Sequence, residues 1–372
     1  MKLTWNWQAL LSLALLAFSL TQLPFTQWLV STAYSPNTKE SLIAVALVAI
    51  SAILSMAAGN KNILTLAFGL FAHLGALELL DMLSFAEGSA SLGYFACLAA
   101  CWLMGWRLVT VLAGDGRNRG WFVNLLIPAL FGLWLLILWE AITRGAGIPF
   151  VLLPPPSAIG ARFMASIPIL AADFNQTVLK AVLFGFVVGS FAGFLVAVLA
   201  DRFRFLERGL LPIGNMVSAL PIIGIAPIMV IWFGFDWQSK AAVVIVMTFF
   251  PMLVNTLAGL SAAGAMERDL MATYAASHWQ TLFKLRLPAA MPFVFNALKI
   301  NSTLAMIGAI VSEFFGTPVV GMGFRISTEV GRMNLDMVWA EIALAAIVGS
   351  LFYGALALLE RITTFWHPSY RR

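Results

Sequence analysis

The chain has 372 residues, of which 61% are hydrophobic and only 10% are charged. Soluble globular domains carry about 25% charged residues, so this composition excludes an ordinary soluble protein and indicates a polytopic membrane protein of the all-α class, surrounded by the lipid bilayer. The net charge of +5 comes from 22 basic and 17 acidic residues. We expect no nucleic-acid partner.

Windows of about 18 or more apolar residues predict about ten transmembrane helices. They lie near residues 9–29, 42–58, 63–80, 92–112, 122–142, 178–199, 210–233, 241–258, 293–315 and 339–359. The first window follows Met1 and Lys2 and could be mistaken for a signal peptide. No convincing small-x-small cleavage site follows it, so we interpret it as an uncleaved first span.

The basic residues predict the orientation of these spans. If the N-terminus is inside, 14 of the 22 lysines and arginines fall on the inner side and seven on the outer side, with Lys299 near a span end. Lysine and arginine accumulate in cytoplasmic loops. We therefore expect both termini in the cytoplasm.

The chain divides at the polar stretch "GDGRNRG" (residues 114–120), whose turn-forming and basic residues indicate a linker. Residues 1–120 form an N-terminal block of about four closely spaced spans, whose function is unknown. Residues 121–372 form the second part, with longer loops. Cys97 and Cys101 lie one helical turn apart in an apolar run, and we interpret them as small buried hydrophobic residues. With three scattered histidines, we expect no metal site.

The stretch "DLMATYAASHWQTLFKLRLPAA" (residues 269–290) is unusually polar for this chain. Placed on one helix from Asp269 to Leu285, it is amphipathic and too short to span the bilayer, and Pro288 should end it. Its polar side contains Thr273, Ser277, Gln280 and Lys284. Such a helix can lie among lipid headgroups or dock on a protein. The small Ala275 at the centre of its apolar side favours a protein partner.

The same stretch resembles the cytoplasmic coupling loop of ABC importer permeases, which runs Glu-Ala-Ala, three residues, Gly, nine residues, Ile-x-Leu-Pro. The spacing is intact but the glutamate, both alanines and the glycine are substituted. The correspondence places Asp269 at the acidic position, Leu270 and Met271 at the alanines, Ala275 at the glycine, and Leu285, Leu287 and Pro288 at the end.

Further blocks resemble the nitrate, sulfonate, taurine and thiamine-precursor branch of these permeases. They are "FVLLPPPSAI" (150–159), "ALPIIGIAPIMVIWFGF" (219–235), "SKAAVVIVMTFFPMLVNTLAGL" (239–260) and "GAIVSEFFG" (308–316). The resemblance covers the chain from about residue 121 to the C-terminus. Residues 1–120 match no family pattern that we identify.

The resemblance implies the permease subunit of an ATP-driven, binding-protein-dependent importer in a bacterial inner membrane. Its core would have six helices, preceded here by about four extra ones, with a coupling helix near residues 267–285. The chain has no G-x-x-x-x-G-K-[ST] phosphate loop, so ATP and Mg²⁺ would be used by two copies of a separate ATPase. The other implied partners are a periplasmic or lipid-anchored solute-binding protein and a second permease copy. We expect no cofactor and no enzymatic activity in this chain.

Polar residues and prolines inside spans are candidates to line the translocation pathway, because such groups persist beside water or protein. The candidates are Asn215, Ser218, Pro221, Pro227, Asn255, Asn301, Ser312 and Glu313. Pro221 and Pro227 are expected to break one span twice. Glu313 has a second interpretation, in which it caps a helix or pairs with an arginine such as Arg325. Asn255 also has a second interpretation, in which its side chain hydrogen-bonds a backbone group that Pro251 leaves without a partner.

The substrate is expected to be a small polar or anionic solute. A vitamin or pyrimidine-like precursor is our first choice, and a sulfonate, taurine or nitrate is the alternative. A secondary transporter driven by an ion gradient is the competing function. That class typically has paired intramembrane carboxylates or inverted repeats, and the sequence indicates neither. A membrane-embedded enzyme would need a catalytic constellation, which we do not find.

Overall fold

The computed structural model describes residues 6–30, 33–57, 62–84, 89–114, 121–218, 221–316 and 319–366. Nearly all the regular structure is helical, which confirms the predicted all-α class. The chain forms two compact units, Met1–Gly160 and Ala161–Arg372, so the fifth helix packs with the N-terminal unit.

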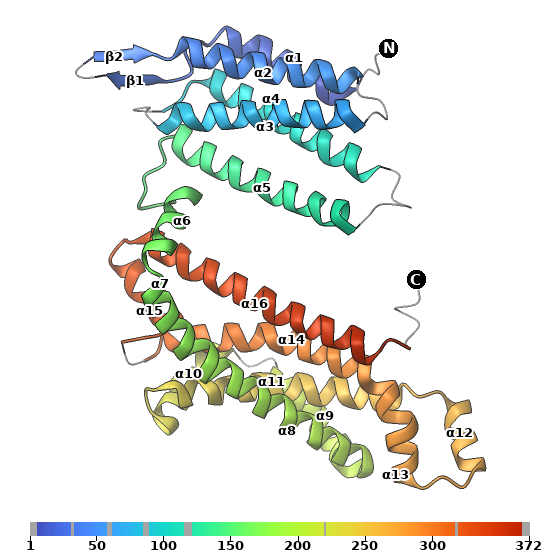
Figure 1. Cartoon of the computed structure of the whole chain (residues 1–372). Coiled ribbons are helices and arrows are strands. Elements are labelled where there is room, and N and C mark those ends of the chain that lie inside the picture. Colours follow the sequence, from blue (N-terminus) through green and yellow to red (C-terminus); the bar gives the residue numbers. More distant parts are fainter. Residues whose placement is uncertain are drawn as a thin grey trace. The chain divides into compact units, whose positions relative to one another are not determined.

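The N-terminal unit is a bundle of five helices laid side by side, with one short hairpin (Figure 1). Its elements are α1 (Trp7–Leu20), β1 (Gln27–Val30), β2 (Ala33–Pro36), α2 (Thr38–Ala57), α3 (Asn62–Ser84), α4 (Leu92–Ala113), α5 (Trp121–Gly145) and the start of α6 (Pro156–Ala165). Asn6 begins α1, because its Oδ1 accepts a hydrogen bond from the Ala9 amide at 2.8 Å. The strands β1 and β2 pair antiparallel.

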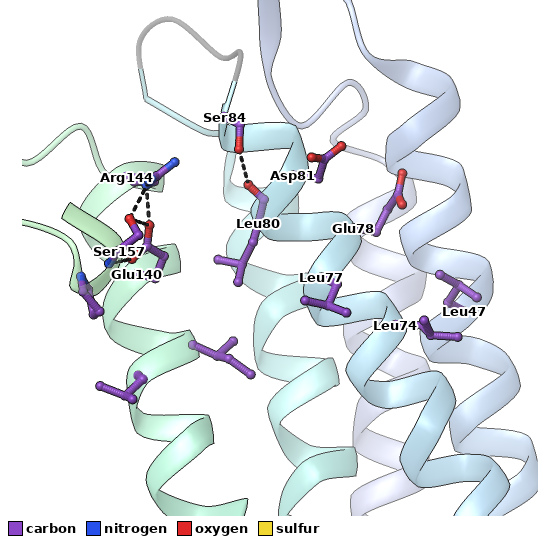
Figure 2. A pocket seen from close by; sticks show the side chains of 13 residues that line it. Leu47, Leu74, Leu77, Glu78, Leu80, Asp81, Ser84, Glu140, Arg144 and Ser157 are labelled. Carbon is purple, nitrogen blue, oxygen red and sulfur yellow. Dashed lines mark hydrogen bonds and ion pairs between the residues drawn. The ribbon is translucent and has the colours of Figure 1, made fainter. Parts of the chain in front are cut away.

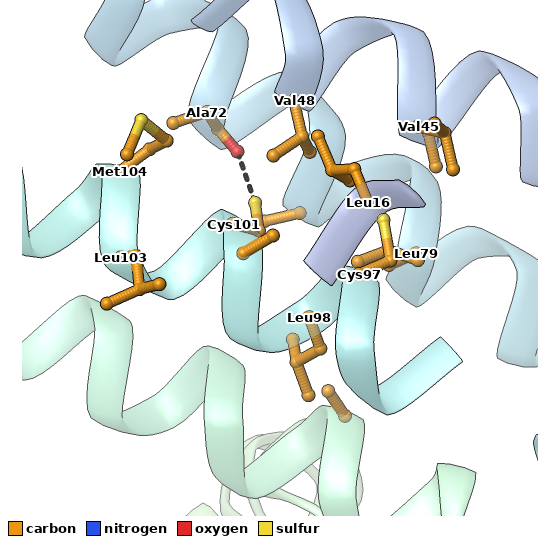
Figure 3. Packing of buried hydrophobic residues seen from close by; sticks show 14 of the residues in the cluster. Leu16, Val45, Val48, Ala72, Leu79, Cys97, Leu98, Cys101, Leu103 and Met104 are labelled. Carbon is orange, nitrogen blue, oxygen red and sulfur yellow. Dashed lines mark hydrogen bonds between the residues drawn. The ribbon is translucent and has the colours of Figure 1, made fainter. Parts of the chain in front are cut away.

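The core of this unit is a continuous apolar cluster contributed by α1 to α5 (Figure 3). Cys97 and Cys101 are both free and buried within it, as the sequence predicted. The Cys101 thiol donates a hydrogen bond to the Ala72 carbonyl at 2.9 Å. Trp134 of α5 belongs to the same cluster, which explains why α5 packs here.

The second unit is centred on α11, which packs against both α8 and α14. Its elements include α7 (Ile167–Phe174), η1 (Asn175–Val182), α8 (Leu183–Arg202), α9 (Arg204–Ser218), α10 (Ile222–Phe233), α11 (Trp237–Ser261), α14 (Leu287–Glu313), α15 (Met322–Gly331) and α16 (Leu335–Thr363). The π-helix η1 joins α7 and α8 into one continuous helix from Ile167 to Arg202.

Glycines allow α8, α11 and α14 to approach closely. A Cβ on Gly189 of α8 would lie 2.1 Å from Thr248 Oγ1 on α11, and one on Gly259 of α11 would lie 2.8 Å from Phe293 Cβ on α14. Small residues at helix contacts give van der Waals packing, which drives helix association in a membrane. These three helices therefore form a tightly packed group.

Among the described residues, eight helices are long and apolar enough to cross a membrane. They coincide with eight of the ten predicted spans. The first prediction is too long, because α1 ends at Leu20 and Pro24 cannot continue it. The prediction for residues 210–233 is also wrong, because that stretch is divided between α9 and α10, with Pro221 as the N-cap of α10.

Candidate functional site

The polar stretch between α11 and α14 contains two helices, so the predicted single helix from Asp269 to Leu285 is wrong. The first helix, α12, covers Ala265–Thr273, and the second, α13, covers His278–Thr281. The chain reverses between them at Ala275, whose φ of +51° lies in the left-handed region. A residue in the left-handed region cannot continue a right-handed helix. The residues that we assigned to the polar and apolar sides of one helix therefore lie on two helices.

A sequence signal for this break was present. Ser277 and Gln280 form a reciprocal capping box, in which Ser277 Oγ accepts from the Gln280 amide and Gln280 Oε1 accepts from the Ser277 amide. A serine followed three residues later by glutamine is the signature of a helix start. The coupling-loop pattern has a glycine at the position of Ala275. A turn with positive φ explains this glycine, since glycine adopts positive φ without strain.

Pro288 does not end a helix, contrary to our prediction. The α-helix α13 continues through a π-helical turn, η2 (Leu282–Arg286), into α14, giving one helix from His278 to Glu313. Proline lacks an amide proton and its ring clashes with the carbonyl four residues earlier. The wider π turn directly before Pro288 shifts the hydrogen-bond pattern and removes this conflict.

The segment formed by residues 262–288, named here the coupling segment, carries a series of exposed apolar side chains. The side chain of Tyr274 is 78% exposed, and the Trp279 and Phe283 rings stack with centroids 6.1 Å apart. The other exposed members are Met266 and Leu270. Exposed apolar patches of this kind mark surfaces that contact a protein or a membrane.

The predicted coupling residues occupy different parts of this segment. Asp269, Leu270 and Ala275 are exposed, and Met271 is half-buried on α12. At the other end, Leu285, Leu287 and Pro288 are half-buried where the segment joins α14. Leu287 packs on a small cluster of Leu260, Leu282 and Ala290. The exposed residues can therefore contact a partner, whereas the half-buried residues connect the segment to the packed group of α8, α11 and α14.

The pathway candidates Asn301 and Asn255 make internal contacts. Asn301 is fully buried, and its Nδ2 donates to Ser190 Oγ at 2.9 Å and to the Thr248 carbonyl at 2.7 Å, which joins α14 to α8 and α11. Asn255 Nδ2 donates to the Pro251 carbonyl at 2.8 Å. Both arrangements favour a structural role for the amide, and the bond of Asn255 is of the local backbone kind that the sequence suggested.

The prolines of the interrupted span behave differently from each other. Pro221 begins α10, whereas Pro227 lies inside α10, which runs on without a break. The predicted second break is therefore wrong, because a membrane helix tolerates an internal proline where neighbouring groups satisfy the freed backbone. Asn215 and Ser218 lie on α9, but their side chains are outside the described residues. Beside this interruption is an apolar cavity of about 200 Å³, lined from α9, α10, α11 and α14.

Glu313 and Ser312 lie buried at the end of α14. Glu313 Oε2 accepts from the Gly323 amide at 2.6 Å and Oε1 accepts from the Thr177 hydroxyl at 2.7 Å. The Ser312 hydroxyl donates to the Ala309 carbonyl in its own helix. Glu313 thus caps the start of α15, which was one of its two interpretations. Its expected partner Arg325 binds elsewhere.

Arg325 pairs with Asp173, a residue that sequence reasoning missed. Arg325 Nε lies 2.9 Å from Asp173 Oδ2, and Asp173 Oδ1 accepts from the Gly321 amide at 2.6 Å. Burial alone lowers the pKa of Arg325, but the hydrogen bond and charge of Asp173 raise it above its ordinary value. The sequence signal was a single aspartate inside an apolar run, which is costly unless it is paired. These contacts fasten α7 to the start of α15.

The N-terminal unit contains an open groove of about 740 Å³ between α2, α3 and α5 (Figure 2). At one end, Glu140 accepts from the Ser157 amide at 2.8 Å and from its hydroxyl at 2.7 Å, and Arg144 pairs with Glu140 at 2.5 Å. These contacts fix the chain after α5.

Glu78 lines the groove, and His73 Nδ1 bonds the Gly69 carbonyl at 2.7 Å. Among the described residues, no group of three or more metal-ligating side chains occurs.

Comparison with known proteins places the second unit in a family. Residues 185–364 match the family described as binding-protein-dependent transport system inner membrane component. The chain is 32% identical over 239 residues to a formylaminopyrimidine transport permease of Halalkalibacterium halodurans, covering 64% of this chain and 95% of that one. It is 28% identical over 236 residues to a riboflavin transport system permease of Chloroflexus aurantiacus, covering 63% and 88%. A putative aliphatic sulfonates transport permease of Bacillus subtilis is 29% identical over 258 residues, covering 68% and 91%.

Proposed function

Because the chain belongs to the family of binding-protein-dependent transport system inner membrane components, the permeases of ABC importers, we propose that its coupling segment binds a separate ATPase subunit. The observation that carries the proposal is the exposed apolar surface of α12 and α13, because α12 lies outside the candidate membrane-spanning helices and α13 is the first turn of the helix from His278 to Glu313. Exposed apolar patches of this kind mark contacts with a protein or a membrane, and we propose a protein partner because the family belongs to ATP-driven importers and the spacing of this stretch resembles their coupling loop.

The contacts of the segment explain how binding would act on the membrane part. Leu270 and Ala275 would meet the ATPase, since they are exposed, and Asp269 would add a charge at the same surface. Met271 is half-buried on α12 and would be less accessible to the partner. Leu285, Leu287 and Pro288 would transmit displacement, because they lie on the continuous helix that becomes α14. ATP and Mg²⁺ would be bound by the partner, in two copies, one for each permease of a homodimer.

The translocation pathway is proposed to run beside the interruption between α9 and α10. Ile222 and Ile225, which lie between Pro221 and Pro227 in the chain, line the apolar cavity there. The neighbouring α10 surface is exposed, with Ile231 80% and Trp232 69% accessible. A second copy of the permease would cover this surface. We place Asn215 and Ser218 on the same path because α9 leads into the interruption. We place Glu313 and Ser312 toward its far end because they end α14, whose Leu304 lines the cavity, and Asn255 and Asn301 brace the helices around it.

The proposed substrate is a small polar or anionic solute, with a vitamin or pyrimidine-like precursor preferred over a sulfonate, taurine or nitrate. Two of the similar permeases are named for nitrogen heterocycles, formylaminopyrimidine and riboflavin. Arg286 and Arg325 are both paired with aspartates, so neither offers a free cation to a dianion. A periplasmic or lipid-anchored binding protein would deliver the solute. Both termini are proposed to be cytoplasmic in a bacterial inner membrane.

The experiment is a pull-down of the tagged protein from its native membranes in detergent. We expect an ATPase with a phosphate loop to co-purify with the wild type and to be lost from Ala275→Glu, because the substitution puts a charge into an apolar contact. Val319→Glu is the control, since Val319 is 74% exposed beyond the opposite end of α14. Retention of the ATPase by a well-expressed Ala275→Glu protein would contradict the proposal.

A further inference from the structure

One arginine joins the ends of three membrane helices at the base of the coupling segment. Arg286 Nη1 lies 2.7 Å from Asp201 Oδ2, and its Nη2 lies 2.5 Å from Asp201 Oδ1. The third donor, Nε, reaches the Leu260 carbonyl at 3.0 Å. The two charged side chains are only 16% and 10% exposed. This bidentate pair is therefore largely shielded from solvent, where such pairs are strongest.

The position of Asp201 does not serve its own helix. Asp201 is the penultimate residue of α8, where the helix dipole is negative and a carboxylate is unfavourable. Lysine or arginine would stabilise this end. The carboxylate is instead held by the guanidinium of Arg286, 85 residues later in the chain. The aspartate is thus unfavourable for the end of α8, but its pair with Arg286 connects α8 to η2.

The contact with Leu260 adds α11 to this connection. Leu260 is in the last turn of α11, where carbonyl groups lack partners within the helix. Arg286 Nε supplies the missing donor. Above this point, Gly259 brings α11 against α14, and Gly189 brings α8 against α11. The three helices that Arg286 joins at their ends are thus the same three that pack closely along their length.

The coupling segment starts directly after α11 and returns to the membrane helices at η2, so Leu260 lies just before its start and Arg286 lies near its end. We infer that Asp201 and Arg286 form a positioning clamp, which closes the base of the coupling segment and makes α8, α11 and α14 move with it as one body. This inference rests on the proposed function, because it assumes that an ATPase displaces the segment. Without the clamp, the segment would bend on its own when the ATPase closes.

The clamp can be tested with two substitutions that keep the side chains similar in size. Arg286→Lys keeps the positive charge, but lysine cannot make the bidentate contact and reach Leu260 at the same time. Asp201→Asn removes the charge of the other partner. Arg332→Lys is the matched control, because Arg332 also pairs with an acidic residue, Glu329, but is 67% exposed and far along the chain from the segment.

The readout is the movement of the membrane part, separate from ATPase binding. The native Cys97 and Cys101 are buried, so a maleimide will label a cysteine introduced by Phe233→Cys, at the exposed end of α10. In the co-purified complex in lipid nanodiscs, we expect ATP to change the labelling rate of this cysteine. Arg286→Lys and Asp201→Asn should keep the ATPase bound and hydrolysing ATP but lose most of this ATP-dependent change.

The outcomes separate the clamp from the proposed function. If no ATPase co-purifies with the wild type, the proposed function fails. If the ATPase binds and both clamp variants retain the full ATP-dependent change, the clamp inference is wrong. If Asp201→Asn fails to fold, by gel filtration and thermal melting, Arg286→Lys alone decides. A loss of the response in Arg332→Lys as well would also overturn the inference, since it would show a non-specific effect.

Discussion

The left-handed conformation of Ala275 gives a quantitative prediction for Ala275→Gly. An L-residue with a side chain costs about 1–2 kcal/mol in this region, and the φ of Ala275 is +51°. Glycine removes that cost but loses about 0.5–1 kcal/mol more chain entropy on folding. We therefore expect Ala275→Gly to stabilise the turn between α12 and α13 by about 0.5–1 kcal/mol.

Hydrogen exchange measures this local effect, because the segment is exposed and can open without global unfolding. The Ala276 amide donates to the Met271 carbonyl at 3.0 Å, so its exchange should slow by about 2- to 5-fold in Ala275→Gly. Ala272→Gly is the control: Ala272 lies inside α12, where glycine costs about 1 kcal/mol, and exchange should accelerate. Equal or faster exchange in Ala275→Gly would refute the left-handed turn.

Three further predictions concern the membrane part. Gly189→Ala should lower the melting temperature, because its Cβ would lie 2.1 Å from Thr248 Oγ1 and overpacking typically costs about 1–3 kcal/mol; an unchanged melting temperature would contradict the close contact of α8 and α11. Glu313→Ala should reduce the free energy of unfolding by about 2–4 kcal/mol, since it leaves the Gly323 amide without its buried acceptor. A reduction below about 1 kcal/mol would mean that the cap is dispensable. Cys101 should not react with a maleimide until the protein is denatured, because its side chain is fully buried; labelling in the native state would show that the core of the N-terminal unit is open.

The positions of most spans followed from the sequence, because membrane insertion depends on the summed apolarity of a local window. Windows fail where a local feature interrupts a helix without lowering hydropathy. Pro221 divides one predicted span in this way, and Ala275 divides the predicted coupling helix through its backbone conformation. The capping box at Ser277 was visible in the sequence, but amphipathic periodicity concealed it.

The sequence by itself determined that the chain is an all-α membrane protein, and the intact spacing from Asp269 to Pro288 led us to propose a partner-binding segment there. Only the tertiary structure decided how the polar residues are used. Asp173 pairs with Arg325 across 152 positions, and Asp201 pairs with Arg286 across 85. Each charge costs several kcal/mol in an apolar environment unless it is paired. The sequence therefore requires partners for these residues, but only the packing of distant helices selects which partners they are.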